Sequence, residues 1–396
     1  MGRRCIIGQS GGPIVAINAT LAGIISNGIS KKYDKVFGMV NGLSGFLDDQ
    51  IIELSQMFEQ ENMLEKLKHT PAMYLGSCRF KIPCKDDSIK QQIIDKLIEY
   101  KIDDFYYIGG NDSMDTIKQM AQYAKEKQYP IHFIGVPKTI DNDLLVTDYT
   151  PGYPSACKYV ATSLLEIALD NSIYPLKSVT IVEIMGRDAG WLTAASQLVN
   201  EKYPNLINLI YLPEMTFDEE EFIEDVKKQL RMRDSVIIAV SEGIKDQYGM
   251  CVSLDSGIQV DAFGHMSNSG SGDYLKNILV NQLNIKVRSI QLSTLQRCSS
   301  HLESQVDIDN AFSIGSYAVE CALNDLSGVM VCIKKDSKNF VLSYVDVCTV
   351  ANKVKLFPLE WIDTKNKQIR KNYIDYIVPF IYASGKIELP DYLMRG

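Results

Sequence analysis

Short apolar segments that end in glycine or a small polar residue alternate with amphipathic segments along most of the chain. The apolar segments predict strands at 4–8, 104–110, 131–139, 178–187 and 234–243. The amphipathic segments predict helices at 16–29, 111–127 and 188–199. Short buried strands that alternate with helices are typical of βαβ units, so the sequence predicts an α/β fold with mostly parallel sheets. In such a fold, functional side chains lie at the carboxyl ends of the strands.

Two segments depart from this pattern. Residues 265–277 are rich in glycine, serine and asparagine, which predicts a flexible surface turn. From Lys334 onward, apolar segments no longer end in glycine, and the sequence predicts a hairpin followed by peripheral helices. We recognise no catalytic motif in that C-terminal part.

Composition narrows the possible partners. The 396 residues suffice for two domains of ordinary size. Lys and Arg total 41 against 49 for Asp and Glu, and the resulting net charge of −8 disfavours attraction to nucleic acid or to an anionic membrane. No window approaches 18 consecutive apolar residues, so no transmembrane helix is expected. Nine scattered cysteines, never spaced as CxxC, indicate a reducing and therefore cytoplasmic setting.

Five predicted strand ends share one chemical character. Each carries glycine or a small residue with polar groups just beyond it: SGGP at 10–13, GGNDS at 109–113, PKTIDND at 137–143, MGRD at 185–188 and SEG at 241–243. Free backbone amides and helix N-termini attract anions, so this repetition indicates an enzyme that handles phosphate. Neither GxxxxGK[ST] nor a GxGxxG after a strand is present, which excludes a standard P-loop and the dinucleotide fingerprint.

The segment TIDND places two carboxylates, Asp141 and Asp143, two residues apart and close to Lys138. An isolated DND sequence is most often a solvated turn. Here it directly follows an apolar strand, so its side chains are expected in the cleft at the sheet edge. A carboxylate there can take the proton of a sugar hydroxyl that attacks phosphorus, and a lysine can neutralise the transferred phosphoryl group.

These motifs together resemble the 6-phosphofructokinases. The matching segments are SGGP with AIN, LGSCR at 75–79, GGNDS, PKTIDND, IVEIMGR, SEGI, DAFGH and LQR at 295–297, in the family's order and at about its spacing. The resemblance covers residues 5–325. It implies the phosphofructokinase fold of two Rossmann-like lobes, and transfer of a phosphoryl group to the 1-hydroxyl of fructose 6-phosphate.

Two positions separate phosphoryl donors within that family. Members that use ATP have glycine at both, whereas members that use pyrophosphate have aspartate and lysine, as this chain does at Asp112 and Lys138. A carboxylate at Asp112 would repel the α-phosphate of ATP, and Lys138 would attract compact, highly charged pyrophosphate. The resemblance therefore implies fructose 6-phosphate and pyrophosphate as substrates of a reversible reaction.

The resemblance also assigns roles to individual residues. The residues implied to bind the donor are Gly11, Gly110, Asp112, Ser113 and Lys138. The residues implied to bind the sugar phosphate are Thr139, Asp141, Asp143, Met185, Gly186, Arg187, Glu242, Arg288, Thr294 and Arg297. Asp141 would be the general base, and Asp112, Lys138 and Arg187 the other catalytic residues. Arg288 and Arg297 would grip the 6-phosphate, which suits bidentate guanidinium chemistry.

Three positions depart from the family pattern. The aspartate usually tied to magnesium is Asn111, whose neutral amide oxygen is a weaker ligand for the expected Mg²⁺. The usual histidine or tyrosine three residues before Arg297 is Thr294, which removes a ring contact to the sugar phosphate. An arginine that the family often supplies to a neighbouring subunit falls at Ser178, beside Lys177.

The domain boundaries and the alternative functions follow from the same resemblance. A donor lobe is expected at 1–145 with a returning segment at 255–305, and a sugar-phosphate lobe at 146–254 with the C-terminal part 306–396. A homodimer or homotetramer is implied. An ATP-dependent phosphofructokinase and a non-catalytic regulatory subunit that binds sugar phosphate remain alternatives. A nicotinamide-dependent oxidoreductase is disfavoured because the glycine fingerprint is absent.

Overall fold

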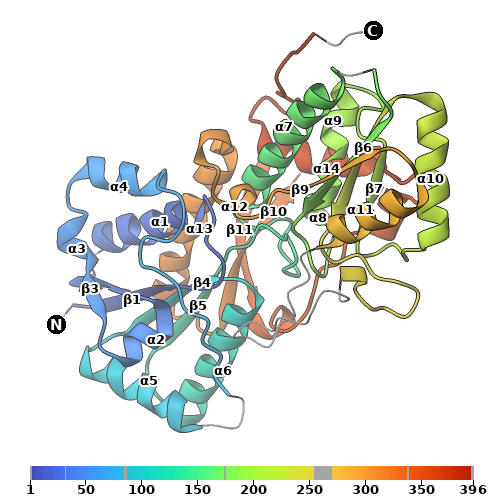
Figure 1. Ribbon diagram of the computed structural model, residues 1–396. Helices are drawn as coiled ribbons and strands as arrows, with labels where there is room; N and C mark the ends of the chain where they lie inside the picture. The colour runs from blue at the N-terminus through green and yellow to red at the C-terminus, as the bar shows by residue number, and fades with distance from the viewer. Residues whose placement is uncertain are drawn as a thin grey trace. The chain divides into compact units, whose positions relative to one another are not determined.

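The computed structural model describes residues 2–31, 33–83, 87–173, 175–253, 270–336 and 339–393. The backbone divides into two compact units. Unit 1 comprises Met1–Ile140, Leu144–Tyr153 and Val306–Val354, and unit 2 comprises Asp141–Asp143, Pro154–Gln305 and Lys355–Gly396. Each unit is built around its own sheet, and Figure 1 labels the elements of both.

Unit 1 contains a seven-stranded sheet with the order β11-β10-β5-β4-β1-β2-β3. Its strands are β1 (Arg4–Gln9), β2 (Lys35–Met39), β3 (Ile51–Glu53), β4 (Asp104–Gly109), β5 (His132–Pro137), β10 (Val329–Asp336) and β11 (Asn339–Asp346). The central pairings are parallel, with Ile6 beside Phe105 and Phe105 beside Phe133. The edge strands β3 and β11 run antiparallel to their neighbours.

The helices of unit 1 pack on this sheet or on one another. They are α1 (Ile17–Ser30), α2 (Gly42–Leu47), α3 (Leu54–Met57), α4 (Glu61–Lys68), α5 (Asp87–Glu99), α6 (Asn111–Lys127) and α13 (Gln305–Leu323). Helices α1 and α13 approach at two glycines. A Cβ on Gly23 would lie 2.0 Å from the carbonyl oxygen of Phe312, and one on Gly315 would lie 2.1 Å from that of Thr20. Glycine is therefore required where these two backbones meet.

Unit 2 contains a four-stranded parallel sheet with the order β7-β8-β6-β9. Its strands are β6 (Ser178–Ile184), β7 (Leu209–Tyr211), β8 (Ser235–Ser241) and β9 (Lys286–Gln291). Its helices are α7 (Tyr153–Asn171), α8 (Trp191–Ala194), α9 (Gln197–Lys202), α10 (Glu219–Met232), α11 (Ser271–Gln282), α12 (Leu295–Cys298) and α14 (Lys371–Ile381). A short ladder pairs β12 (Ile362–Asp363) with β13 (Gln368–Ile369).

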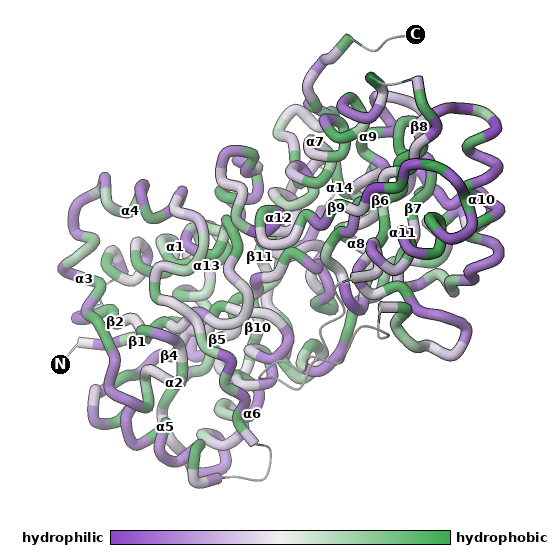
Figure 2. The backbone as a smooth tube through the Cα atoms, in the orientation of Figure 1, coloured by the Kyte–Doolittle hydropathy of each residue, from purple (hydrophilic) through white to green (hydrophobic). Residues whose placement is uncertain are grey.

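Helix α10 illustrates how the sequence dictates packing in unit 2. Asp218 begins the helix by accepting the backbone N–H of Glu221 at 2.8 Å, and three glutamates follow in the first turn, where the helix dipole favours them. Phe222, Val226 and Leu230 recur at helical spacing and are buried against the sheet. The outer positions are charged, so α10 is largely purple with green at intervals in Figure 2.

The five predicted strands are confirmed as β1, β4, β5, β6 and β8, and the α/β class with mostly parallel sheets is confirmed with them. The predicted C-terminal hairpin is β10–β11. The predicted helix at 188–199 is instead two short helices, α8 and α9, joined by a tight turn. None of the helices within the described ranges is both long and apolar enough to cross a bilayer.

The prediction of a surface turn at 265–277 is wrong for its second half. Residues 271–277 belong to helix α11, whereas 265–269 lie outside the described residues. The buried carboxylate of Glu183 accepts the backbone N–H of Gly270 at 3.1 Å and of Gly272 at 2.7 Å, which stabilises the beginning of this helix. Leu275 and Leu279 then pack into the core of unit 2. A polar, glycine-containing sequence concealed this long-range support.

The predicted returning segments of the two lobes need correction as well. Residues 270–305, expected with the first lobe, belong to unit 2, because β9 pairs with β6. Residues 306–354, expected with the second lobe, belong to unit 1, because β10 pairs with β5. The helical and strand patterns predict elements, but they do not say which sheet a late strand joins. The functional role of each unit stays a prediction.

Candidate active site

In unit 1, the end of β1 forms a glycine turn with exposed backbone groups. The Ser10 amide still bonds the carbonyl oxygen of Ile108 at 3.0 Å, and the chain then leaves the sheet at Gly11, whose φ is +83°. Only glycine adopts that conformation readily. The Ser77 hydroxyl donates to the Gly11 carbonyl at 2.7 Å, so the LGSCR segment fixes the turn. Gly11 therefore lies where a donor-binding residue was predicted, at a strand end.

Lys138 comes directly after β5 and reaches this glycine turn. Its backbone N–H continues the ladder to the carbonyl oxygen of Gly109 at 3.0 Å, and its side chain is 4% exposed. Its Nζ donates to the Gly12 carbonyl at 2.8 Å, and a Cβ on Gly11 would lie only 3.0 Å from it. A buried ammonium group beside a glycine turn is a favourable place for a phosphate oxygen.

The N-terminus of helix α6 adds the third part of this group. A Cβ on Gly109 would lie 1.9 Å from the Ser113 hydroxyl, so glycine lets the first turn of the helix pack against the strand end. Asp112 lies in that first turn, and its Oδ1 is 3.7 Å from Nζ of Lys81. We define the donor group as Gly11, Gly110, Asp112, Ser113 and Lys138, all in unit 1.

Asn111, the predicted magnesium ligand, uses both ends of its amide in the structure. Its Oδ1 accepts the backbone N–H of Asn352 at 2.6 Å, and its Nδ2 donates to the carbonyl oxygen of Lys353 at 2.5 Å. Among the described residues, no cluster of three or more His, Cys, Asp or Glu is arranged to hold a metal ion. The side chains that the structure describes therefore form no closed metal site of these residue types, and the metal role of Asn111 stays a prediction.

In unit 2, the TIDND segment presents its two carboxylates close together. Asp143 has its pKa raised to about 7, because it is desolvated and because the negative charges of Asp141 and Asp188 lie nearby. Lys355 opposes this rise with its positive charge. Asn142, between the two carboxylates, is fully buried and has a left-handed φ of +53°. Thr139, which belongs to unit 1, begins this motif, and its carbonyl oxygen accepts the Thr150 hydroxyl at 2.8 Å.

The MGR turn and Glu242 form a second polar group in unit 2, at the adjacent ends of β6 and β8. The Gly186 amide donates to Oε1 of Glu242 at 3.3 Å, and the Ser241 hydroxyl donates to the Gly186 carbonyl. Gly186 has a φ of +134°, and a Cβ on Gly243 would lie 1.8 Å from the Arg187 carbonyl oxygen. Glycine is therefore required on both sides of this approach.

Electrostatics link Glu242 to the TIDND carboxylates. Desolvation and then the charge of Asp141 raise the pKa of Glu242 to about 7, while Arg187 lowers it. Arg187 also contacts Asp188, with Nε 3.2 Å from Oδ2. A raised carboxyl pKa caused by several converging acids is typical of a site that receives positive charge or transferable protons. We define the acceptor group as Asp141, Asp143, Met185, Gly186, Arg187 and Glu242.

The predicted 6-phosphate residues lie on β9 and around α12 of unit 2. Arg288 is partly exposed and its Nη1 is 3.1 Å from Oδ2 of Asp170. The Arg297 Nε is buried and has no hydrogen-bond partner within the described residues. Gln296 accepts the Met185 amide at 3.1 Å and thereby joins α12 to the MGR turn. Thr294 is exposed at the N-cap of α12.

The substitution Asp143→Asn is expected to stabilise the protein at pH 8 more than at pH 5. The folded-state pKa of about 7 lies well above the usual range of an aspartate carboxyl, so folding strengthens proton binding by this group. Its stabilising contribution is full below about pH 4 and is lost as the pH rises through about 7. Asparagine carries no charge, so the variant does not bury a carboxylate on folding. We therefore expect the Tm of Asp143→Asn to exceed that of the wild type by about a few degrees at pH 8. An equal gain at both pH values in thermal unfolding would contradict the assigned pKa shift.

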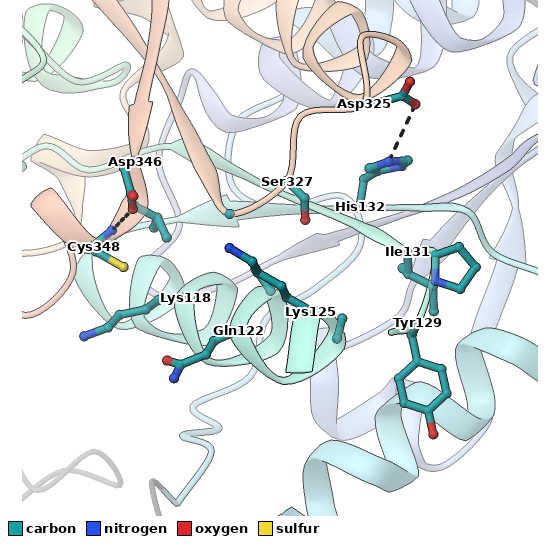
Figure 3. Close-up of a pocket in the computed structure, with 15 residues that line it drawn as sticks. Lys118, Gln122, Lys125, Tyr129, Ile131, His132, Asp325, Ser327, Asp346 and Cys348 are labelled. Atoms are coloured by element: carbon teal, nitrogen blue, oxygen red, sulfur yellow. Dashed lines mark hydrogen bonds and ion pairs between the residues drawn. The ribbon is translucent and has the colours of Figure 1, made fainter. Parts of the chain in front are cut away.

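A cavity of about 480 Å³ in unit 1 contains none of the predicted site residues. Figure 3 shows Lys118, Gln122 and Lys125 of α6 at this cavity, together with His132, whose Nε2 lies 3.7 Å from Asp325. It is lined by the first residue of β5 and the second half of α6, whereas Lys138 and Asp112 lie at the opposite ends of these elements. The cavity is therefore separate from the donor group.

Comparison with known proteins agrees with this arrangement of motifs. The phosphofructokinase family model matches residues 4–322. The chain belongs to the phosphofructokinase family. It is 36% identical to a pyrophosphate--fructose 6-phosphate 1-phosphotransferase of Xanthomonas campestris pv. campestris over 97% of this chain and 94% of that protein. A protein of the same description from Methylococcus capsulatus is 33% identical, over 99% of this chain and 95% of that one.

A solved structure supports the same conclusion about the fold. The pyrophosphate-dependent phosphofructokinase of Nitrosospira multiformis superposes with a TM-score of 0.85 at 28% sequence identity, over 99% of this chain and 94% of that chain. The family resemblance and the phosphofructokinase fold expected from the motifs are thus confirmed. The DAFGH motif at 261–265, which contributed to the resemblance, lies outside the described residues.

Sequence reasoning missed residues that contact the predicted ones. Lys81 beside Asp112, Gln296 beneath Met185, and Lys355 beside Asn142 and Asp143 were not singled out. Gln296 lies inside the LQR motif and carried a usable signal. Lys81 and Lys355 lie in ordinary polar contexts, so only the fold reveals what they contact.

Proposed function

We propose that this chain is a pyrophosphate-dependent 6-phosphofructokinase, a phosphotransferase. It transfers a phosphoryl group from pyrophosphate to the 1-hydroxyl of fructose 6-phosphate, giving fructose 1,6-bisphosphate and inorganic phosphate. The single observation that carries the choice of donor is the buried ammonium group of Lys138 at the glycine turn of unit 1. Asp112, in the first turn of α6, is the second residue on which the choice of donor depends. The near full-length similarity to pyrophosphate-dependent relatives supports the same choice.

The proposed chemistry divides between the two groups. The donor group holds pyrophosphate through Lys138, the backbone at Gly11 and the N-terminus of α6. In the acceptor group, Asp141 takes the proton of the 1-hydroxyl as that oxygen attacks phosphorus in line. The P–O bond to the leaving phosphate breaks as the new ester forms. Arg187 and Lys138 stabilise the negative charge of the transferring group.

The sugar phosphate is proposed to bind to the acceptor group and to three further residues outside it, Thr139, Arg288 and Arg297. Arg288 and Arg297 would bind its 6-phosphate, because guanidinium groups bind phosphate in a bidentate manner. Glu242 would accept hydrogen bonds from sugar hydroxyls, aided by the Met185–Arg187 turn that it fixes. Thr139 and Asp143 would complete the site from the TIDND segment.

Asp112 is proposed to exclude ATP. A carboxylate about 4 Å from the α-phosphate costs about 4 kcal/mol at a protein surface. Pyrophosphate has no third phosphoryl group and meets the Asp112 charge only from farther away, where Lys81 compensates it. The ATP-dependent reaction remains the second candidate only because it uses the same fold and base. A non-catalytic subunit is disfavoured, since Asp141, Lys138 and Arg187 are all present.

Mg²⁺ is proposed to enter with pyrophosphate rather than to reside in the protein. Magnesium is commonly held by substrate phosphates, waters and one or two protein oxygens, and it would supply charge neutralisation on the donor. Cytoplasmic location and assembly as a homodimer or homotetramer are proposed from the cysteine pattern and the family resemblance. Partners that are nucleic acid or membrane are not expected at a net charge of −8.

Replacing Lys81 with alanine is expected to raise the KM for pyrophosphate severalfold, with a smaller change in kcat. The variant leaves Asp112 without the cation 3.7 Å away, so an incoming anion meets an uncompensated carboxylate. The effect should shrink at high ionic strength, because both side chains are partly exposed. Lys31→Ala removes an exposed charge elsewhere in unit 1 and serves as the control. Equal KM changes in both variants would refute a specific role for Lys81.

The reverse reaction tests the proposed function. Fructose 1,6-bisphosphate, inorganic phosphate and Mg²⁺ are incubated with the protein, and fructose 6-phosphate is detected through isomerase and dehydrogenase coupling. Phosphorus NMR should show pyrophosphate forming in equal amount. Fructose 6-phosphate without pyrophosphate would indicate simple hydrolysis and would contradict the proposal.

A further inference from the structure

The C-terminal segment 355–381, which carries no recognisable motif, makes hydrogen bonds to Asn142 and Asp143 of the TIDND loop in unit 2. The Lys355 amide donates to the carbonyl oxygen of Asp143 at 2.7 Å. Its Nζ donates to Oδ1 of Asn142 at 3.3 Å. From the other side, Nδ2 of Asn142 donates to the hydroxyl oxygen of Tyr376 at 2.9 Å. The amide of Asn142 is thus held at both ends by two different parts of the C-terminal segment.

The backbone conformation of Asn142 explains why these hydrogen bonds matter for the carboxylates on either side of it. Its φ of +53° lies in the left-handed region, which asparagine tolerates better than most residues, and its exposed fraction is 0%. A single left-handed residue therefore separates Asp141 from Asp143. A change in the dihedral angles of Asn142 would turn both flanking carboxylates. Fixing this one side chain consequently fixes the direction of the carboxylate on either side.

Aromatic side chains pack around Lys355 and Tyr376 and limit the movement of both residues. Nζ of Lys355 lies 4.9 Å from the ring centroid of Trp191, whose Nε1 donates to the Lys355 carbonyl at 2.8 Å. The Trp191 ring also contacts Phe357 and Tyr376, at centroid distances of 5.0 and 5.6 Å. Trp191 begins α8, four residues after Arg187. These aromatic side chains therefore surround the two residues, Lys355 and Tyr376, that contact Asn142.

We propose that Lys355 and Tyr376 are positioning residues for the general base. They hold Asn142 in its left-handed conformation and so keep the Asp141 carboxylate directed at the acceptor hydroxyl. The inference rests on the proposed function only for the role of Asp141 as base. A base displaced by about 1 Å loses a factor of about 10 to 100 in rate, so these residues set kcat without touching substrate.

The charge of Lys355 gives a second consequence. The charged groups whose influence on Asp143 is resolved are Asp141, Asp188 and Lys355, and of these only Lys355 lowers the pKa of Asp143. Removing that ammonium group raises the pKa of Asp143 further. Because Asp143 is proposed to complete the site beside Asp141, the pH below which its protonation lowers kcat (the acid limb of the kcat profile) moves upward. A purely structural lysine would not move this limb.

The test compares two hydroxyl deletions in the same helical region. Tyr376→Phe removes the partner of Asn142 and keeps the ring, and we expect kcat to fall about tenfold with KM values within about twofold of the wild type. Tyr382→Phe removes a buried hydroxyl that has no hydrogen-bond partner within the described residues, and it should leave kcat unchanged. Thermal unfolding of both variants checks that neither has lost its fold.

Two further variants separate positioning from general damage. Asn142→Gly keeps the left-handed backbone accessible but deletes both side-chain bonds, so combining it with Tyr376→Phe should give much less than the sum of the two effects. Lys355→Met should lower kcat and shift the acid limb to higher pH, and Lys355→Arg should restore both. Additive effects, or a loss in Tyr382→Phe equal to that in Tyr376→Phe, would overturn the proposal.

Hydrogen exchange keeps this inference independent of turnover. Peptides that cover 139–144 should exchange faster in Tyr376→Phe and Asn142→Gly than in the wild type and Tyr382→Phe. If the wild type failed to turn over fructose 6-phosphate with pyrophosphate, the proposed function would be refuted. Hydrogen exchange would still test whether Tyr376 holds Asn142 in place. Unchanged hydrogen exchange in Tyr376→Phe would refute the proposal that Tyr376 holds Asn142 in place.

Discussion

Replacing Asp141 with alanine is expected to lower kcat about a thousandfold in either direction of the reaction. The variant deletes the proposed base, and general-base catalysis contributes factors of about 10² to 10⁴. Binding should change much less, because the arginines, Glu242 and Lys138 all remain. Steady-state kinetics with both substrates, together with circular dichroism, checks this expectation.

The same substitution also alters its neighbours in a direction that can be measured. The charge of Asp141 raises the pKa of both Asp143 and Glu242, so these values should fall towards the ordinary range in the variant. Glu224→Gln, on the exposed face of α10, is a matched control that removes a distant carboxylate of unit 2. A kcat within tenfold of the wild type in Asp141→Ala would refute the assignment of the base.

Replacing both Asp112 and Lys138 with glycine is expected to exchange one donor for the other. Loss of Lys138 removes a buried ammonium group from the glycine turn, so kcat/KM for pyrophosphate should fall by at least a hundredfold. Loss of Asp112 removes the repulsion towards an α-phosphate, so turnover with ATP should become detectable.

The single variants separate these two effects. Asp112→Gly should relax the exclusion of ATP while retaining some use of pyrophosphate. Lys138→Gly should lose pyrophosphate without gaining ATP. Coupled assays with each donor over a range of concentrations measure both constants. An Asp112→Gly enzyme that still rejects ATP would show that the carboxylate is not what excludes it.

Much of the site was predictable because local sequence determines it. Gly11 and Gly186 occupy backbone conformations that favour glycine, and the parallel strands deliver Lys138, Arg187 and Glu242 to strand ends. An apolar run followed by a polar, glycine-containing turn identifies such a strand end from a few residues of sequence. The α/β fold and the family could therefore be predicted from the motifs.

The remaining features depend on contacts between distant parts of the chain. Helix α11 begins where Glu183, nearly 90 residues earlier, accepts its first amides, and no window around 271 contains that information. Strand β10 joins the sheet of unit 1 through β5, which pattern alone could not decide. Lys355 and Tyr376 reach Asn142 across more than 200 positions. These long-range contacts are what the structure adds.

Donor choice is the central claim, and one comparison tests it most directly. The wild-type protein is given fructose 6-phosphate and Mg²⁺ with pyrophosphate in one reaction and with ATP in another, and fructose 1,6-bisphosphate is measured by coupling to aldolase. The account predicts turnover with pyrophosphate and none with ATP. Turnover with ATP alone would leave the fold and Asp141 as base intact, but it would contradict the roles given to Asp112 and Lys138.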